Sequence, residues 1–283
     1  MNYFKKVSRI AWLNIKKWRS SLRIIMIGIL LVIFIHANLT NLIDFLNSVD
    51  IPITPWVFPF LLEWRSQKLL LFLPLIFLFS DAPFIDKNQL YVVLRAGRLS
   101  WASGQILYIL FASFIYFFII IILTILMLIP NVTFDLQWGD AITTLSKTNA
   151  GDNFGVIIPF KRHILDYFSP LQAMFYSYLL SSLIGSILGM LMFVINVVSK
   201  KSVLGIIITS SMVLFDVIIW SRGLLLWFSP VSWATLSAIR IDGARGLPNF
   251  TQIMVMISLI ITTLITLIFW LSKKMELNEL HAE

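Results

Sequence analysis

The 283-residue chain contains no cysteine, three histidines and few charged residues. Without cysteine, it forms no disulfides and offers no thiolate metal ligand or cysteine nucleophile. Charged residues make up 13% of the chain, whereas soluble domains have about a quarter. The hydrophobic fraction is 59%, more than a water-soluble fold of this size can bury. The composition therefore excludes an ordinary soluble domain and indicates an integral membrane protein.

The motifs that carry common enzyme chemistry are also missing. The sequence has no G-x-x-x-x-G-K-[ST] to bind ATP phosphates, and neither H-E-x-x-H nor G-x-S-x-G occurs. Its histidines, His36, His163 and His281, are far apart in the sequence and fall at different predicted membrane depths. We therefore expect no catalytic residues, cofactor or metal site in this chain.

What the sequence does contain is long apolar segments. Six of them are long enough to cross about 30 Å of hydrocarbon as helices: Leu22–Phe45, Gln67–Ile85, Gly104–Ile129, Leu171–Val198, Val203–Trp220 and Ile253–Leu271. The second has the weakest pattern, because Pro74 interrupts it and charged residues flank its core. We predict an all-α membrane protein with six transmembrane helices in a single domain, 1–283. A long outer connection, 130–170, follows the third helix, and 272–283 form a tail.

Most of the 22 lysines and arginines lie on one side of these six segments. They occur before the first segment, between the second and third, between the fourth and fifth, and after the sixth. Cytoplasmic loops carry an excess of basic residues. The pattern therefore predicts that both termini are cytoplasmic.

Residues 1–21 are predicted to form an amphipathic helix at the inner membrane surface. At about 100° per residue, apolar side chains share one face and most basic side chains fall on the other. The apolar face consists of Tyr3, Phe4, Val7, Ile10, Ala11, Ile15 and Trp18. The alternative is a basic tail that only sets the topology.

The connection between the second and third segments, SDAPFIDKNQLYVVLRAGRLSW, is predicted to form a short cytoplasmic helix. Asp86 and Gln89 resemble a capping box at its start, and Gly97 suits a left-handed stop at its end. Apolar groups combined with arginines favour a surface that docks another protein. The alternative is an anchor on the inner leaflet, with arginines on lipid phosphates. The remaining residues of this surface are Leu90, Tyr91, Leu94, Arg95 and Arg98.

Between the fifth and sixth segments, Leu224–Phe228 and Val231–Ile239 are too apolar for a solvated loop and too short to cross a membrane. Ser229 and Pro230 separate them. Irregular backbone at membrane depth must face protein or water. We therefore predict two short re-entrant helices, with a pair of surface-lying helices as the alternative.

Two features inside the apolar segments concern packing and charge. Ser181, Gly185 and Gly189 recur every four residues, a spacing that lets a neighbouring helix approach closely. That neighbour belongs either to the same chain or to a second copy. Asp216 lies inside the fifth segment, where an acid is costly, so it marks an intramembrane polar site unless it reaches the outer surface.

This layout resembles the permease subunits of bacterial ABC-2-type transporters. Such permeases have six spans with both ends inside, an amphipathic interface helix, a coupling helix between spans two and three, and re-entrant helices before span six. The likeness is strongest in DAPFIDKNQLYVVLRAGRLSW. The outer connection 130–170 is longer than is usual in that family.

The resemblance implies a permease in the bacterial plasma membrane that pairs with a second, identical or related permease subunit. Separate ATPase subunits would bind ATP and Mg²⁺ and act through the helix between spans two and three. It also implies export of a peptide, an antibiotic or another amphiphile. The alternatives are the membrane component of a vitamin or cofactor importer and a non-transporting scaffold. No nucleic-acid partner is expected, because the positive charge suits topology and anionic lipid.

Overall fold

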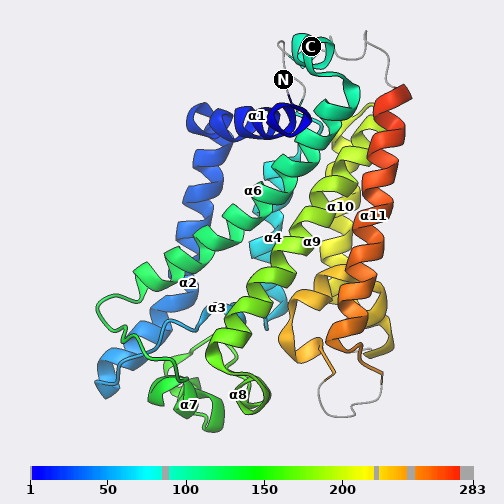
Figure 1. Ribbon diagram of the computed structural model, residues 1–283. Coiled ribbons are helices and arrows are strands. Elements are labelled where there is room, and N and C mark those ends of the chain that lie inside the picture. Colours follow the sequence, from blue (N-terminus) through cyan, green and yellow to red (C-terminus); the bar gives the residue numbers. More distant parts are fainter. Residues whose placement is uncertain (1, 85–88, 220–222, 241–245, 275–283) are drawn as a thin grey trace.

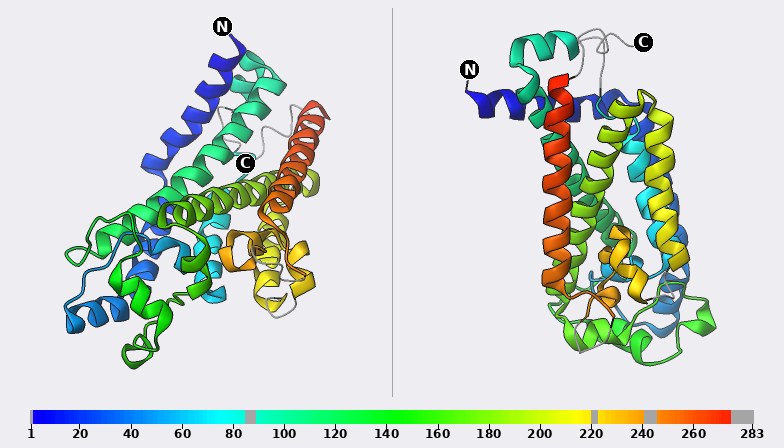
Figure 2. Two further views of the ribbon diagram at one scale, coloured as in Figure 1. Left: turned by 60° about the horizontal axis from the view of Figure 1, so that its bottom comes forward. Right: turned by 90° about the vertical axis from the view of Figure 1, so that its right-hand side faces the viewer.

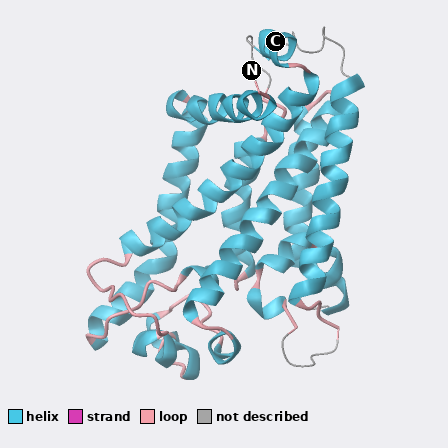
Figure 3. Cartoon of the chain, in the orientation of Figure 1, coloured by secondary structure: helices cyan, strands magenta, loops and turns pink. Residues whose placement is uncertain are grey.

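The computed structural model describes residues 2–84, 89–219, 223–240 and 246–274. Within these ranges the chain is built from helices, and the β pairing is limited to an isolated bridge between Ile53 and Val132. Long helices run side by side, and loops gather at the two ends of this bundle (Figures 1 and 3). The end that carries the N-terminal helix is called the α1 end below.

Within the described residues, five helices are long and apolar enough to cross a membrane. They are α2 (Leu22–Val49), α6 (Arg98–Met127), α9 (Pro170–Ser199), α10 (Ser202–Ile219) and α11 (Phe250–Lys274). They coincide with five of the six predicted segments. The outward faces of α2, α10 and α11 carry exposed apolar side chains such as Ile29, Ile218 and Leu259. The all-α, multi-pass membrane class predicted from composition is therefore confirmed.

The predicted second span, Gln67–Ile85, is wrong as a helix of membrane length. α4 (Arg65–Phe79) has 15 residues and contains Pro74, so it is only about 22 Å long at ~1.5 Å per residue. It follows α3 (Phe58–Leu61), whose four residues are fully buried. α4 packs against α2, α9 and α10. Hydropathy overestimated its length because a segment enclosed by protein is as apolar as one that faces lipid.

α9 packs against α4, α6, α10 and α11, and its row of small residues makes close contacts possible. A Cβ atom on Gly185 would lie 2.7 Å from Cδ2 of Leu75 in α4, and Ser181 is fully buried. A Cβ atom on Gly189 would lie 2.7 Å from Cγ2 of Ile109 in α6. The row Ser181, Gly185 and Gly189 therefore packs within the chain. Of the two alternatives left by the sequence, the structure favours intramolecular packing over a dimer seam.

Replacing Gly189 with alanine is expected to destabilise the protein by about 1–3 kcal/mol, because the added methyl overlaps both α6 and Phe79 of α4. Gly28 is the matched control, since a Cβ atom there meets nothing within 4 Å. Gly28→Ala should leave stability unchanged or raise it by up to about 1 kcal/mol through helix propensity. Unfolding in mixed micelles, followed by tryptophan fluorescence, measures both variants. Equal stabilities would contradict the close approach at Gly189.

The predicted N-terminal helix is present as α1 (Tyr3–Lys16) and continues as η1 (Lys17–Ser20). It lies across the end of the bundle rather than along it (Figures 1 and 2). Val7, Ile10 and Ala11 are buried, and Ile10 contacts α6 so closely that a Cβ atom on Gly104 would lie 2.6 Å from it. The centre of the predicted apolar face therefore packs on protein and does not face lipid.

The two ends of the same face differ from its centre. Ile15 and Trp18 are half-buried, and Trp18 Nε1 donates to the hydroxyl of Tyr108 in α6 at 2.8 Å. Phe4 is 76% exposed, so this residue of the predicted apolar face does not pack on α6 as the centre of the face does. Trp12 and Leu13 are also exposed, and both lay outside the predicted face. α1 thus presents apolar side chains on two sides, one against α6 and one outward.

The long connection 130–170 folds into a cap at the opposite end of the bundle (Figure 1). It contains α7 (Gly139–Lys147), η2 (Asp152–Phe154) and α8 (Arg162–Tyr167). Thr54 donates to the carbonyl of Trp138 at 2.8 Å, and Trp56 Nε1 donates to that of Asp135 at 2.7 Å. These bonds attach the cap to the segment that leads into α3.

Candidate functional site

A short helix projects from the α1 end of the bundle. α5 (Gln89–Ala96), drawn in teal, stands beyond the ends of the long helices (Figure 2). Tyr91 is 71% exposed and Leu94 62% exposed, and Arg95 is exposed beside them. Val93 is buried. α5 is therefore anchored by one side and presents two large apolar groups and a guanidinium on the other.

The junction between α5 and α6 is a sharp turn at Gly97, whose φ is +89°. Its N–H donates to the carbonyl of Val93 at 2.8 Å. Arg98 Nη1 donates to the carbonyl of Lys273 at 2.6 Å, so Arg98 ties this junction to the end of α11. Of the predicted docking residues, Arg98 is therefore engaged within the chain. Asp86 and the side chain of Leu90 lie outside what the structure describes.

A groove of about 550 Å³ lies between α1 and α5. Three of its lining residues are basic: Lys6 and Arg9 from α1 and Arg95 from α5. Lys6 Nζ donates to the carbonyl of Ala96 at 3.5 Å, which links the two helices. The apolar lining is Ile10, Leu13, Val92 and Ala96. Cations above an apolar floor complement an acidic, amphipathic protein segment.

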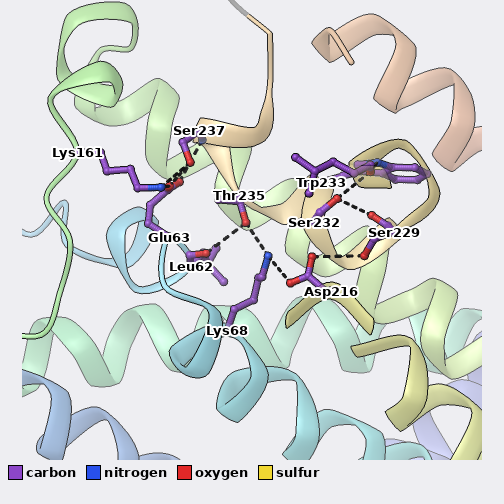
Figure 4. A network of polar contacts seen from close by, with 11 residues as sticks. Leu62, Glu63, Lys68, Lys161, Asp216, Ser229, Ser232, Trp233, Thr235 and Ser237 are labelled. Atoms are coloured by element: carbon purple, nitrogen blue, oxygen red, sulfur yellow. Dashed lines mark hydrogen bonds and ion pairs between the residues drawn. The ribbon is translucent and has the colours of Figure 1, made fainter. Parts of the chain in front are cut away.

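A second region consists of buried charged and hydroxyl side chains (Figure 4). Lys68 on α4 and Asp216 on α10 form an ion pair, with 2.7 Å between Nζ and Oδ2, and each side chain is 1% exposed. Lys68 Nζ also donates to Thr235 Oγ1 at 2.8 Å. Ser229 Oγ donates to the other oxygen of Asp216 at 3.3 Å. Asp216 thus lies inside the protein and is fully partnered.

Thr235 and Ser229 belong to the segment between α10 and α11, which folds into the bundle. It forms three 3₁₀ helices, η3 (Gly223–Phe228), η4 (Pro230–Ala234) and η5 (Leu236–Ala238), where two re-entrant helices were predicted. Trp233 is 1% exposed and its Nε1 donates to the carbonyl of Leu226 at 3.0 Å. Such side-chain bonds satisfy backbone groups that 3₁₀ turns leave free. Residues 229–239 are mostly buried inside the protein, which does not fit the surface-lying alternative for that part, whereas Phe228 at the end of η3 is 75% exposed.

A second buried ion pair holds the far end of this segment. Lys161 Nζ lies 2.9 Å from Oε2 of Glu63, whose side chain is fully buried. Lys161 also donates to Ser237 Oγ at 2.8 Å, and the Ser237 N–H donates to Glu63 Oε1 at 3.2 Å. The two ion pairs together fix the segment to α4 and α10 on one side and to the cap 130–170 on the other (Figure 4).

These contacts form one polar network, which consists of Glu63, Lys68, Lys161, Asp216, Ser229, Thr235 and Ser237. Removing charges from water is costly, and the cost is offset only while every partner stays in place. Lys68 lies in the first turn of α4, and the other end of α4 leads toward α5. α4 therefore carries the lysine of the network near its first residue and precedes α5 in the chain at its other end.

Similarity to known proteins does not assign this chain to a family. No protein-family model, curated protein sequence or solved structure matches it. The geometry of α5 and of the polar network is therefore what points to a function.

Sequence reasoning singled out Asp216 but not its partners. Lys68 was treated as the edge of a span, although a lysine within an apolar run was the available signal. Glu63 and Lys161 carried no signal, because both lie outside the predicted membrane spans, where a single charged residue is ordinary. The groove residues Lys6 and Arg9 were read only as part of a basic face. None of these pairings follows from local spacing.

Proposed function

We propose that this chain is the permease subunit of an ATP-driven transporter of the ABC-2 type in a bacterial plasma membrane. The observation that carries the proposal is the α1 end: a helix lying across the bundle, and beside it α5, which exposes Tyr91, Leu94 and Arg95. A simple connection between two membrane helices needs no projecting helix with large apolar groups. A joint to another protein needs both apolar contact and charge.

The proposed topology has six crossings with both termini in the cytoplasm. Five crossings are the membrane-length helices. The sixth combines α4 with the buried stretch 57–62 before it, since α4 alone is too short. A composite crossing of this kind is tolerated because protein surrounds its irregular part.

In the proposed mechanism, Tyr91 and Leu94 enter an apolar cleft of a separate ATPase subunit, and Arg95 pairs with an acid there. ATP and Mg²⁺ bind to that partner, and two permease chains, identical or related, enclose the path. Motion of α5 passes along α4 to Lys68 and thereby to the polar network near the outer cap. Export of a peptide, antibiotic or other amphiphile is the proposed direction and cargo class.

Cross-linking tests the docking surface, because the chain has no cysteine of its own. The variant Leu94→Cys places one thiol on the exposed side of α5. We expect a bifunctional thiol-to-amine reagent to join this variant to a co-purifying ATPase in membranes of the native host. The product is identified by mass spectrometry, and its ATP hydrolysis is measured.

Lys201→Cys is the matched control, because Lys201 is exposed at the same end of the bundle, on the turn before α10. It should give little or no cross-linked ATPase. Equal cross-linking from both positions would mean that α5 is not the contact. A chain that purifies with no ATPase would contradict the proposal and favour a scaffold, and uptake of a vitamin by vesicles would favour an importer.

A further inference from the structure

A pocket of about 210 Å³ lies at the α1 end, where η1, α2, α4 and α6 meet. Its polar lining includes Asn14, Lys17, Arg23 and Asp81, and Trp18 and Tyr108 form an aromatic wall. The pocket is separate from the groove between α1 and α5 and from the polar network. Nothing in the coupling mechanism uses it.

Asn14 carries an unmet hydrogen-bonding group in this pocket. Its side chain amide is buried, at 3% exposure, and Nδ2 donates to Oε1 of Gln105 at 2.6 Å. Its Oδ1 atom is also buried and accepts no hydrogen bond from the described residues. A buried acceptor without a partner costs about 1–3 kcal/mol. A ligand that donates a hydrogen bond to Asn14 would remove that cost.

The charged groups of the pocket suit a phosphate together with a donor. Arg23 pairs with Asp81, and its Nη1 donates to Ser80 Oγ at 3.0 Å, while the Arg23 and Asp81 side chains remain 37% and 58% exposed. With Lys17, the lining has two cations and one carboxylate. The Tyr108 hydroxyl accepts from Trp18, which leaves its proton to donate. Arginine, lysine and hydroxyl donors together are a suitable set for a phosphate.

The lining also has an apolar part, whose neighbours in α2 and α4 include exposed apolar residues. Ile24 of α2 and Leu78 of α4 form this part. The next residue of α2, Ile25, is exposed and apolar, as is Phe77 of α4. The ends of membrane-spanning helices lie at headgroup level, and aromatic rings favour that level. The pocket therefore combines a polar end with an apolar exit at the depth of a lipid headgroup.

We propose that this pocket binds the headgroup of a phospholipid that carries both a phosphate and a hydrogen-bond donor, as phosphatidylethanolamine and phosphatidylglycerol do. The phosphate contacts Lys17, Arg23 and Tyr108. The ammonium or hydroxyl group donates to Oδ1 of Asn14 and to Asp81. The acyl chains leave past Ile24 and Leu78. Phosphatidylcholine has no headgroup donor and leaves Asn14 unpaired.

Lipid retention tests the assignment. The full chain is reconstituted in nanodiscs of equal phosphatidylethanolamine and phosphatidylcholine, and the lipids that remain bound are identified by native mass spectrometry. We expect phosphatidylethanolamine to be retained over phosphatidylcholine by about tenfold or more, the ratio that one satisfied buried group supplies. The same preference is expected when phosphatidylglycerol replaces phosphatidylethanolamine.

Asn14→Leu should reduce this preference by about tenfold. Lys17→Gln should lower the retention of both lipids by about tenfold without changing their ratio, because both carry the phosphate. Arg19→Gln should change neither. Arg19 is the matched control because it is an exposed cation of η1 that does not line the pocket. Lys17→Gln tests the phosphate contact separately if Asn14→Leu fails to fold. Equal retention of the two lipids would overturn the proposal, and so would an unchanged preference in Asn14→Leu together with unchanged retention in Lys17→Gln.

A competition arm separates a lipid from a water-soluble ligand of the same chemistry. Phosphoethanolamine is added to the detergent-solubilised protein while bound phosphatidylethanolamine is followed. We expect no displacement at millimolar concentration, because the soluble compound lacks the acyl chains that contact Ile24 and Leu78. Displacement at micromolar concentration would assign the pocket to a soluble phosphate compound and overturn the lipid assignment.

Discussion

Replacing Lys68 with methionine is expected to destabilise the protein by about 3–5 kcal/mol. The substitution leaves the carboxylate of Asp216 buried, with Ser229 as its only remaining partner in the described network. It also removes a donor from Thr235 Oγ1. The loss is measured as a shift in the unfolding midpoint in mixed micelles, followed by tryptophan fluorescence.

Two companion variants identify the cause of that loss. Lys68→Met combined with Asp216→Leu should recover most of the stability, because no buried charge is left unpaired. Lys161→Met should cost less than Lys68→Met, since Glu63 keeps two donors from Ser237 and the Lys161 side chain is 33% exposed. A double variant as unstable as Lys68→Met alone would mean that packing, not charge, explains the effect.

In the proposed complex with an ATPase subunit, Arg95→Glu is expected to abolish the stimulation of ATP hydrolysis, a loss of more than about tenfold, without unfolding the chain. Arg95 is exposed on α5 and lines the groove with Lys6 and Arg9. In the proposed complex, Arg95 pairs with an acidic residue of the ATPase subunit. A glutamate at position 95 would place two negative charges next to each other, which costs several kcal/mol. ATPase activity is measured on the complex in nanodiscs, with and without the permease.

Arg19→Glu is the matched control, because Arg19 is an exposed arginine at the same end but outside the groove. It should retain stimulation, and Arg95→Lys should retain part of it, since lysine keeps the charge but not the planar fork. Normal stimulation in Arg95→Glu would exclude a coupling role for α5. A loss of similar size in Arg19→Glu would mean that overall charge, not the groove, governs the interaction.

Local properties of the sequence predicted the membrane class, the five helices of membrane length in the described residues and the N-terminal amphipathic helix. Each of these features depends on hydropathy or periodicity, and both properties can be read from one continuous segment of the sequence. The projecting helix was also predictable, because Gly97 and the apolar residues before it are close in sequence. The predicted start of this helix at Asp86 was not tested, because Asp86 lies outside the described residues.

The tertiary structure alone decided where charge and space are placed. Lys68 and Asp216 are distant in sequence, and only the packing of α4 against α10 brings them together. The sequence left two candidate neighbours for Gly185 and Gly189, and the structure places α4 and α6 of the same chain against them. The unmet oxygen of Asn14 arises because α1 lies across α6 beside a pocket that α2 and α4 complete. Hydropathy and periodicity are properties of one segment, whereas pairing, close approach and enclosure depend on several segments at once, so the sequence alone could not determine them.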